Sequence, residues 1–423
     1  MNGGLERFLL QTVPKMRWYP FKRERITKVS VEGQVRIDGE RSVVCCRYFF
    51  NSGRSELLMI PVVEMHGEAL DGTQDEVVQD HLLQMIDMAS GEGVVFQGRR
   101  FSGAPRRYGE RRIFQGEQSN TSILFGREVM LKVIRRFTPG PNPDWEMPLM
   151  LRKGGFRRVP EPIGIVEAVM GSERGTFLSA SGFVENDGDG WSRFTSTLTG
   201  SGSGLKADVT DLGENLARMH NILLESGSEV ASRQRIETLR ASVMRNLSAL
   251  RERVQEGRPS EVLGSLSLVN TIDGSLASVL GTRFCRIHGD LHLGQVLHSP
   301  DGYYFIDFEG EPARPLEERI AMNSPLKDLA GLVRSLHYAA TFAWKVGGAD
   351  RDSMEAWYGE HSDLLIRKYM DRSELVDEMG EQRATAALRF YTIEKALYEV
   401  SYEMNNRPDW VQIPLEYIGG LIA

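Results

Sequence analysis

The hydrophobic pattern of the chain begins with short runs typical of β-strands. Residues 42–50 and 56–63 are rich in β-branched and aromatic side chains and are bounded by Gly, Asn and Asp turn residues. Such runs predict strands of an antiparallel sheet. Apolar residues at spacings of three and four then predict a helix over residues 75–89. The first hundred residues are therefore predicted to be rich in β-structure.

A polar segment, residues 98–112, interrupts this pattern with six arginines among glycine and proline. Two interpretations fit it, a nucleic-acid patch and a solvated linker between domains. The acidic balance of the whole chain favours the linker. Beyond it, apolar runs at residues 113–114, 123–125 and 129–134 predict a second, hairpin-rich sheet.

The period of the apolar positions becomes helical in the second half. Residues 186–205 are dense in glycine and serine, which predicts a flexible connection or lid. Helical patterns follow at residues 212–224 and 236–254, with a strand-like run at 282–287. The chain beyond residue 324 is predicted to be mostly helical. One of its predicted helix faces carries Leu329, Leu332, Val333 and Leu336.

Composition narrows the function classes. The 423 residues carry 51 Lys plus Arg against 58 Asp plus Glu, a net charge of −7, which argues against a nucleic-acid binder that relies on overall positive charge. No run of about 18 apolar residues occurs, and the N-terminus lacks a signal-peptide pattern, so the expected location is the cytoplasm. Three cysteines without metal-ligand spacing are expected to be reduced, buried thiols.

The segment around Asp290 carries the most informative chemistry. An amide, Gln295, follows five residues later, and after a turn Asp307 ends an apolar strand. Protein kinases space a proton-accepting Asp, a metal-binding amide and a metal-binding Asp in the same way. Phosphoryl transfer requires hard oxygen ligands for Mg²⁺ beside a carboxylate that orients the attacking hydroxyl. The spacing therefore predicts ATP-dependent phosphoryl transfer.

Two histidines in the same segment leave another chemistry open. His288 and His292 flank Asp290, and together the three could form the metal site of a hydrolase. The remaining histidines form no comparable ligand cluster. We expect His288 to brace the loop by hydrogen bonding rather than to bind metal.

An upstream lysine and a polar turn complete the kinase pattern. Lys132 lies among apolar residues that predict a buried strand, and Glu146 is the expected partner of its ammonium. The alternative is a strand-edge lysine with its charge in water. The turn at residues 116–122 takes the place of a phosphate loop, although a plain polar hairpin turn is also consistent with it. Its candidate phosphate-binding residues are Ser119, Asn120, Thr121 and Ser122.

Longer motifs resemble bacterial maltokinases over nearly the whole chain. The motifs are residues 118–122, 139–144, 288–295, 307–312, 324–331 and 398–410. The resemblance implies an α+β, bilobal protein kinase-like fold of the aminoglycoside phosphotransferase type with a β-rich N-terminal cap. We expect a cap at residues 1–112, a small lobe at 113–185 and a large lobe at 186–423. Residues 17–22 depart from the family pattern, which weakens the comparison in the cap.

The resemblance also implies an activity. Maltokinases transfer the γ-phosphate of ATP to the anomeric hydroxyl of maltose, giving maltose 1-phosphate for glycogen, α-glucan and trehalose metabolism. The family includes actinobacterial glucosamine kinases, so a glucosamine kinase giving glucosamine 6-phosphate is the alternative. An inactive nucleotide-binding module is a third hypothesis. The resemblance implies ATP, Mg²⁺ and a sugar as ligands, with neither nucleic acid nor membrane, and an association with a trehalose- or maltose-metabolising enzyme.

Roles for individual residues follow from the same resemblance. Asp290 is the expected catalytic base, and Lys132 with Glu146 the expected phosphate-binding pair. Mg²⁺ ligands are expected at Gln295, Asp307 and Glu309, and the adenine-binding hinge at Phe183, Val184 and Glu185. The expected sugar-binding residues are His292, Glu399, Tyr402, Glu403, Asn406 and Arg407. A C-terminal helix that merely packs is the alternative for the last five.

Overall fold

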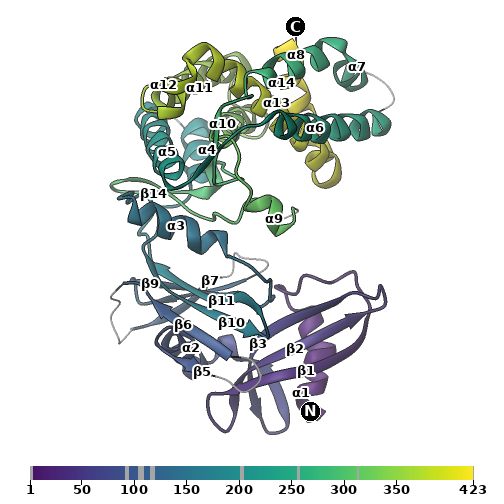
Figure 1. Ribbon diagram of the computed structural model, residues 1–423, viewed down its shortest axis with the longest axis vertical. Coiled ribbons are helices and arrows are strands. Elements are labelled where there is room, and N and C mark those ends of the chain that lie inside the picture. Colours follow the sequence, from purple (N-terminus) through teal and green to yellow (C-terminus); the bar gives the residue numbers. More distant parts are fainter. Residues whose placement is uncertain are drawn as a thin grey trace. The chain divides into compact units, whose positions relative to one another are not determined.

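The computed structural model describes residues 3–90, 95–102, 109–114, 120–200, 204–254, 258–311 and 314–422. These residues form two compact units (Figure 1). The N-terminal unit contains residues 1–149 and 160–185, and the C-terminal unit contains residues 150–159 and 186–423. None of the helices described is both long and apolar enough to span a lipid bilayer.

The N-terminal unit begins with an antiparallel four-stranded sheet in the order β1-β2-β3-β4. The two strands predicted for this region are confirmed. The elements are α1 (Gly3–Arg7), η1 (Phe8–Thr12), η2 (Val13–Lys15), β1 (Ile26–Arg36), β2 (Arg41–Phe50), β3 (Ser55–Met65) and β4 (Glu68–Asp71).

A seven-stranded antiparallel sheet follows, in the order β5-β6-β10-β11-β9-β8-β7. Its strands are β5 (Ala89–Ser90), β6 (Val95–Arg100), β7 (Arg111–Phe114), β8 (Thr121–Phe125), β9 (Val129–Val133), β10 (Pro162–Met170) and β11 (Glu173–Gly182). The helices near it are η3 (Gly72–Gln74), α2 (Glu76–Gln84), η4 (Met85–Asp87) and α3 (Pro143–Lys153). The helix predicted at residues 75–89 is therefore present but ends earlier.

Part of the expected connector belongs to this second sheet. Arg99 and Arg100 lie in β6, which pairs with β10, and their guanidinium groups bind carboxylates of the same unit. Arg99 pairs with Glu167 at 2.9 Å and Arg100 with Asp87 at 2.6 Å. Arg99 and Arg100 therefore stabilise the fold and give no support to the nucleic-acid interpretation. Arg106 and Arg107 of the same segment lie outside the described residues.

The two sheets share one apolar core. Side chains of β2 and β3 pack with those of α2, β6, β8, β9, β10 and β11 in a single buried cluster. A buried cation, Arg135, also joins them: it binds Asp71 of β4 at 3.0 Å and lies 4.3 Å from the ring of Trp18. The residues expected to form a separate cap and a small lobe lie in one compact unit, and their division at residue 112 stays a prediction.

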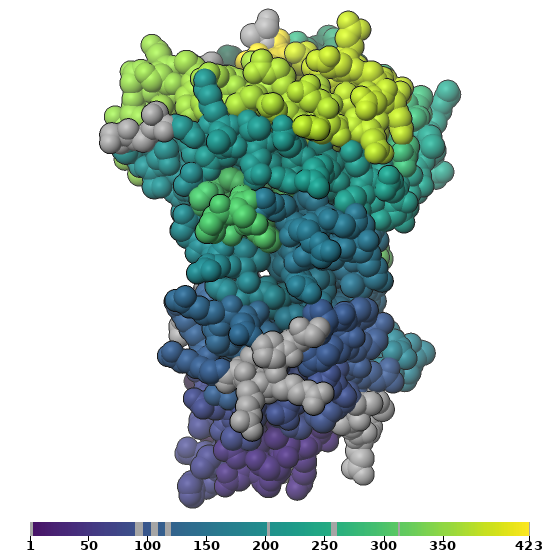
Figure 2. All heavy atoms as spheres, turned by 90° about the vertical axis from the view of Figure 1, so that its left-hand side faces the viewer, coloured from purple at the N-terminus to yellow at the C-terminus, as the bar shows by residue number. Residues whose placement is uncertain are grey.

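The C-terminal unit is mainly helical. Its central helix is α10 (Leu326–Lys345), against which α4 (Gly190–Thr199), α11 (Arg351–Met370) and α13 (Glu381–Asn406) pack. The four leucine and valine side chains predicted to share one face of this helix are all buried. Residues beyond about 350, yellow-green in Figure 2, lie together at one end of this unit.

The remaining elements of this unit are shorter or lie around the central helices. They are α5 (Lys206–Ser226), β12 (Ser228–Val230), α6 (Arg233–Arg253), α7 (Arg258–Gly264), α8 (Leu266–Ala277), β13 (Arg283–Cys285), η5 (Leu293–Gln295), β14 (Val296–Ser299), β15 (Gly302–Phe305), α9 (Leu316–Arg319), α12 (Glu374–Met379), η6 (Pro408–Trp410) and α14 (Gln412–Ile422). Cys45, Cys46 and Cys285 are buried free thiols, as predicted.

Helix α4 corrects the prediction of a flexible lid. Asp189 caps the helix, because its Oδ1 accepts a hydrogen bond from the Ser192 amide at 2.7 Å. Phe194 is fully buried and fixes the helix to the core. This helix was missed in the sequence analysis because residues 186–205 are rich in glycine and serine, and the pattern gave no weight to the single buried aromatic residue, Phe194. Residues 201–203 of the expected lid lie outside the described residues.

Candidate active site

Two loops of the C-terminal unit lie side by side, the loop that carries Asp290 and the segment after β15. The Gln295 side-chain amide donates to Asp307 Oδ2 at 3.0 Å, and the Ile306 amide donates to the Gln295 carbonyl at 3.0 Å. A Cβ atom on Gly289 would lie 3.4 Å from Gly310 Cα, so the backbones approach closely. Asp307 has a φ of 63°, which aspartate adopts rarely. The hairpin of β14 and β15 therefore unites the predicted amide and the second predicted acid.

A buried aspartate, Asp328 at the start of α10, holds the Asp290 loop. Its two carboxylate oxygens accept the backbone amides of His288 and Gly289 at 2.8 and 2.9 Å. His220 contacts the same carboxylate at 3.2 Å. Burial raises the pKa of Asp328, but these hydrogen bonds and the nearby histidines outweigh that effect and hold the pKa below its ordinary value. Sequence reasoning missed this role, although Asp328 lies in one of the motifs that carry the family resemblance.

His288 braces the loop, as predicted. Its Nε2 lies 2.8 Å from the Ile306 carbonyl, and its Nδ1 accepts the Asp290 amide at 3.4 Å. Both ring nitrogens of His288 are thus engaged, which removes it from the ligand set of the alternative metallohydrolase site. The histidine tautomer here is inferred from these hydrogen bonds.

His292 is a neutral histidine that faces a cavity. Its Nδ1 accepts the Gly294 amide at 3.0 Å, so the proton of the neutral ring resides on Nε2. Burial lowers the pKa of His292 to about 4. The ring therefore offers a hydrogen-bond donor, rather than a charge, to a ligand at neutral pH.

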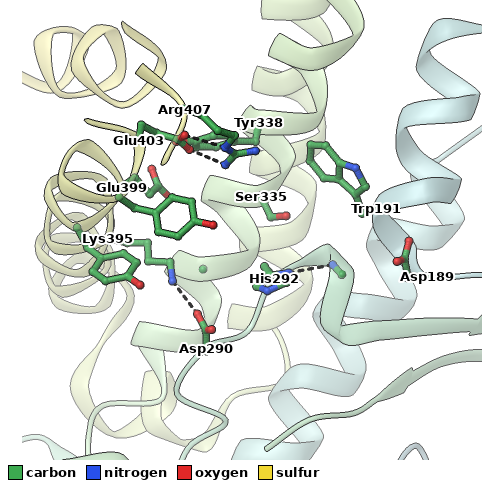
Figure 3. Close-up of a pocket in the computed structure, with 14 residues that line it drawn as sticks. Asp189, Trp191, Asp290, His292, Ser335, Tyr338, Lys395, Glu399, Glu403 and Arg407 are labelled. Carbon is green, nitrogen blue, oxygen red and sulfur yellow. Dashed lines mark hydrogen bonds and ion pairs between the residues drawn. The ribbon is translucent and has the colours of Figure 1, made fainter. Parts of the chain in front are cut away.

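Asp290 is paired with a lysine that the sequence analysis did not predict. Lys395 of α13 places its Nζ 3.0 Å from Asp290 Oδ1 (Figure 3). Burial raises the pKa of Asp290, but the positive charge of Lys395 and the neighbouring histidines outweigh it and hold the pKa below its ordinary value. The carboxylate is thus ionised and ready to accept a hydrogen bond.

A cavity of about 460 Å³ opens beside Asp290. Five of the six predicted sugar-binding residues line it, namely His292, Glu399, Tyr402, Glu403 and Arg407. Asn406 does not line it and instead donates to the Tyr402 carbonyl at 2.9 Å. Trp191 of α4 and Tyr338 of α10 supply aromatic surface on other walls (Figure 3).

The carboxylates contributed by α13 are held in place by ion pairs. Arg334 binds Glu399 at 2.7 Å, and Arg407 binds Glu403 with two hydrogen bonds of 2.9 and 2.7 Å. The Tyr338 hydroxyl also donates to Glu403 at 3.1 Å. Helix α13 therefore packs through these residues and presents them to the cavity at the same time. Fixed acceptors and aromatic faces are the groups that bind the hydroxyls and apolar face of a sugar.

The predicted metal ligands of this unit offer the correct donor atoms. Asp307 and Glu309 each present a carboxylate oxygen, and these oxygens lie within 4.8 Å of each other. Gln295 adds an amide beside Asp307. Carboxylate and amide oxygens suit Mg²⁺, whereas no cysteine or histidine enters this set. The residues present therefore fit a magnesium ion.

The predicted phosphate-binding lysine lies in the N-terminal unit. Lys132 in β9 binds Asp144, in the first turn of α3, at 3.0 Å. The sequence analysis named Glu146, two residues further along the same turn, as its partner. The side chains of Lys132 and Glu146 are both only partly exposed. The role of the lysine in binding phosphate stays a prediction.

The remaining nucleotide-binding candidates also belong to this unit. Thr121 and Ser122 lie in β8 rather than in a loop, and the Thr121 hydroxyl accepts from the buried Arg135 at 2.6 Å. Asn120 directly precedes that strand, while Ser119 lies outside the described residues. The expected hinge of Phe183, Val184 and Glu185 follows β11 immediately. Its Phe183 amide donates to the Glu128 carbonyl at 2.8 Å.

Comparison with known proteins identifies the family. Residues 151–362, half of the chain, match the phosphotransferase enzyme family. The chain belongs to this family. The matched region contains the Asp290 loop, Gln295 and Asp307, which are the residues that the spacing argument selected.

Its relatives include two named glucosamine kinases. One, from Streptacidiphilus jiangxiensis, is 24% identical over 92% of both chains. The other, from Mycolicibacterium smegmatis strain ATCC 700084 / mc(2)155, is 25% identical over 70% of this chain and 76% of its own. A solved glucosamine kinase in complex with glucosamine, ADP and inorganic phosphate superposes with a TM-score of 0.75 at 18% identity, covering all of both chains. The predicted α+β, protein kinase-like fold is confirmed.

Proposed function

We propose that the chain is an ATP-dependent sugar kinase and that its acceptor is glucosamine. The kinase class rests on the family and on the Asp290, Gln295 and Asp307 arrangement. Relatives that cover most of the chain carry the name glucosamine kinase. Maltose, the acceptor expected from the sequence, finds no such support. The alternative acceptor is therefore preferred to the first.

One observation carries the choice of an amino sugar, the charge of the acceptor cavity. Four carboxylates line it against two cationic side chains, so the lining charge is 2 − 4 = −2, and Arg334, which binds Glu399 from outside the lining, brings the local charge to −1. A protonated amino group is attracted by such a wall, whereas neutral maltose gains nothing from it. The acidic residues are Asp189, Asp290, Glu399 and Glu403, and the basic ones are Lys395 and Arg407.

The proposed mechanism is a direct, in-line transfer. The Asp290 carboxylate accepts the hydrogen bond of the acceptor hydroxyl and takes its proton as the oxygen attacks the γ-phosphorus. The bond from that phosphorus to the β-phosphate oxygen breaks, and ADP leaves. Gln295, Asp307 and Glu309 would hold Mg²⁺, which neutralises phosphate charge when bound. The phosphate-binding role of Lys132, in the N-terminal unit, stays a prediction.

The test is a sugar panel with the full chain. Purified protein is incubated with MgATP and glucosamine, N-acetylglucosamine, glucose or maltose, and ADP release is measured. We expect glucosamine to give the highest kcat/KM and N-acetylglucosamine, which lacks the positive charge, to give a lower one. A preference for maltose would support the maltokinase hypothesis instead. If no sugar of the panel leads to ADP release, the hypothesis of an inactive nucleotide-binding module is favoured.

Two expectations from the sequence stay predictions beside this proposal. They are the cytoplasmic location and the association with a sugar-metabolising enzyme. The expected association with a trehalose- or maltose-metabolising enzyme has less support once glucosamine is the proposed acceptor.

A further inference from the structure

A buried ammonium group contacts the proposed catalytic base. Lys395 lies in the middle of α13, and its side chain is only 16% exposed. Its Nζ is 3.0 Å from Asp290 Oδ1 and 3.9 Å from Glu311 Oε1. Burial disfavours the charge, but Asp290, Glu311 and Glu399 outweigh it and raise the pKa of Lys395. The lysine is therefore a fixed positive charge.

Lys395 lies in the walls of two cavities. It lines the acceptor cavity and a neighbouring cavity of about 190 Å³ that contains Glu311, Arg314 and Lys327 in its wall. Glu311, only 4% exposed, is itself bound by Arg314. Lys395 thus also lies beside a second carboxylate, which has its own cationic partner. Its ammonium points toward Asp290 (Figure 3).

Replacement of a buried ion pair by well-packed apolar residues is often neutral or even stabilising. Stability alone is therefore a weak reason for a buried lysine beside Asp290. The position of the ammonium on the carboxylate suggests a functional reason. Lys395 occupies Oδ1 of the carboxylate, which leaves Oδ2 for the acceptor hydroxyl.

We propose that Lys395 is a positioning residue that fixes the Asp290 carboxylate in one rotamer, with one oxygen free for the sugar. This inference rests on the proposed function, because it assigns Asp290 the role of base. It adds a specific consequence. Loss of the ammonium lets the carboxylate rotate and removes the charge that keeps it ionised.

The groups that face Asp290 distinguish Lys395 from its neighbours. Both ring nitrogens of His288 are engaged by backbone groups, the Ile306 carbonyl and the Asp290 amide. His292 has a pKa of about 4 and is neutral at assay pH. Among the described groups facing Asp290, Lys395 therefore supplies the positive charge at neutral pH.

The test compares two buried lysines. Lys395→Met removes the ammonium at Asp290. Lys327→Met is the matched control, because Lys327 is similarly buried at 14% exposure but binds Glu394, at 3.3 Å. We expect Lys395→Met to lower kcat about 30-fold to 100-fold with little change in the KM for MgATP, while Lys327→Met stays within about threefold of wild type.

The pH profile separates positioning from a general structural role. Without Lys395 the pKa of Asp290 rises, so the acid limb of kcat/KM for the sugar is expected to move to higher pH. Ethylammonium added to Lys395→Ala is expected to restore part of the lost kcat, because the site opens on the acceptor cavity. This rescue also tests the proposal if Lys395→Met fails to fold.

The outcomes are distinct. The role of Lys395 is overturned if the acid limb of kcat/KM does not move and ethylammonium restores no kcat. It is also overturned if Lys395→Met and Lys327→Met lose kcat to the same extent. If Asp290→Asn remains active under the same conditions, the proposed function itself fails. An inactive Asp290→Asn with a fully active Lys395→Met rejects this inference alone.

Discussion

The Asp290 carboxylate is the residue on which the chemistry depends. Asp290→Asn keeps the size of the side chain but removes its capacity to accept a proton. We expect kcat to fall by about 10³-fold while ATP binding is retained, measured by steady-state kinetics and by calorimetry with ATP. Asp301→Asn, in the exposed turn of the β14–β15 hairpin, is the matched control and should stay near wild type. Turnover of Asp290→Asn within a few-fold of wild type would contradict the assignment.

A second residue-scale prediction concerns the pH dependence of stability. The pKa of His292 is lowered from 6.5 to about 4 by burial, so between these values the unfolded chain binds more protons than the folded one. Stability from this group is therefore fully present above about pH 6.5 and is lost as the pH falls toward 4. Unfolding in urea should show a loss of roughly 3 kcal/mol across this window.

His292→Gln should reduce that slope, since glutamine does not titrate. His66→Asn is the control, because His66 is exposed and has a positive φ that asparagine tolerates. An equal slope in wild type and His292→Gln would show that other groups govern the loss. His81, His337 and His361, whose pKa values are also lowered by burial, would then be the groups to test.

At the scale of elements, the start of α10 fixes the catalytic loop. Asp328 is 1% exposed and accepts two loop amides, so Asp328→Asn turns one acceptor into a donor that faces an N–H group. We expect a loss of about 3 kcal/mol in the free energy of unfolding, measured in urea, and a lower kcat. The exposed Asp352 of α11, as Asp352→Asn, should change neither quantity.

Helix α4 allows the charge of the acceptor cavity to be tested without loss of structure. Asp189 both caps α4 and lines the cavity. Asparagine is an equally good cap, so Asp189→Asn removes a negative charge but keeps the helix start. We expect the KM for glucosamine to rise about fivefold and the KM for glucose to change little. A parallel rise for both sugars would argue against an electrostatic role.

The elements also show what the sequence could and could not reveal. Gln295 and Asp307 flank one hairpin, so their spacing in the chain was sufficient to predict that they meet. The loop that carries Asp290 directly precedes this hairpin and lies beside the segment that follows it. Lys395 and Asp328 approach the same loop from 105 and 38 residues beyond Asp290, and only tertiary packing brings them there. Helix α4 was missed because one buried aromatic residue outweighs the glycine and serine around it.

At the scale of the whole molecule, the shared core of the N-terminal unit predicts the effect of truncation. A chain that begins at residue 113 would lose the strands and helix that cover the second sheet, and Arg135 would lose Asp71 as the partner of its buried charge. We expect this truncated protein to be insoluble or to lack a cooperative thermal transition. Asp71→Asn in the full chain removes only the negative charge that faces Arg135. It should lower the melting temperature but leave the thermal transition cooperative. A truncated chain that unfolds cooperatively and phosphorylates sugar would instead establish residues 1–112 as an independent cap.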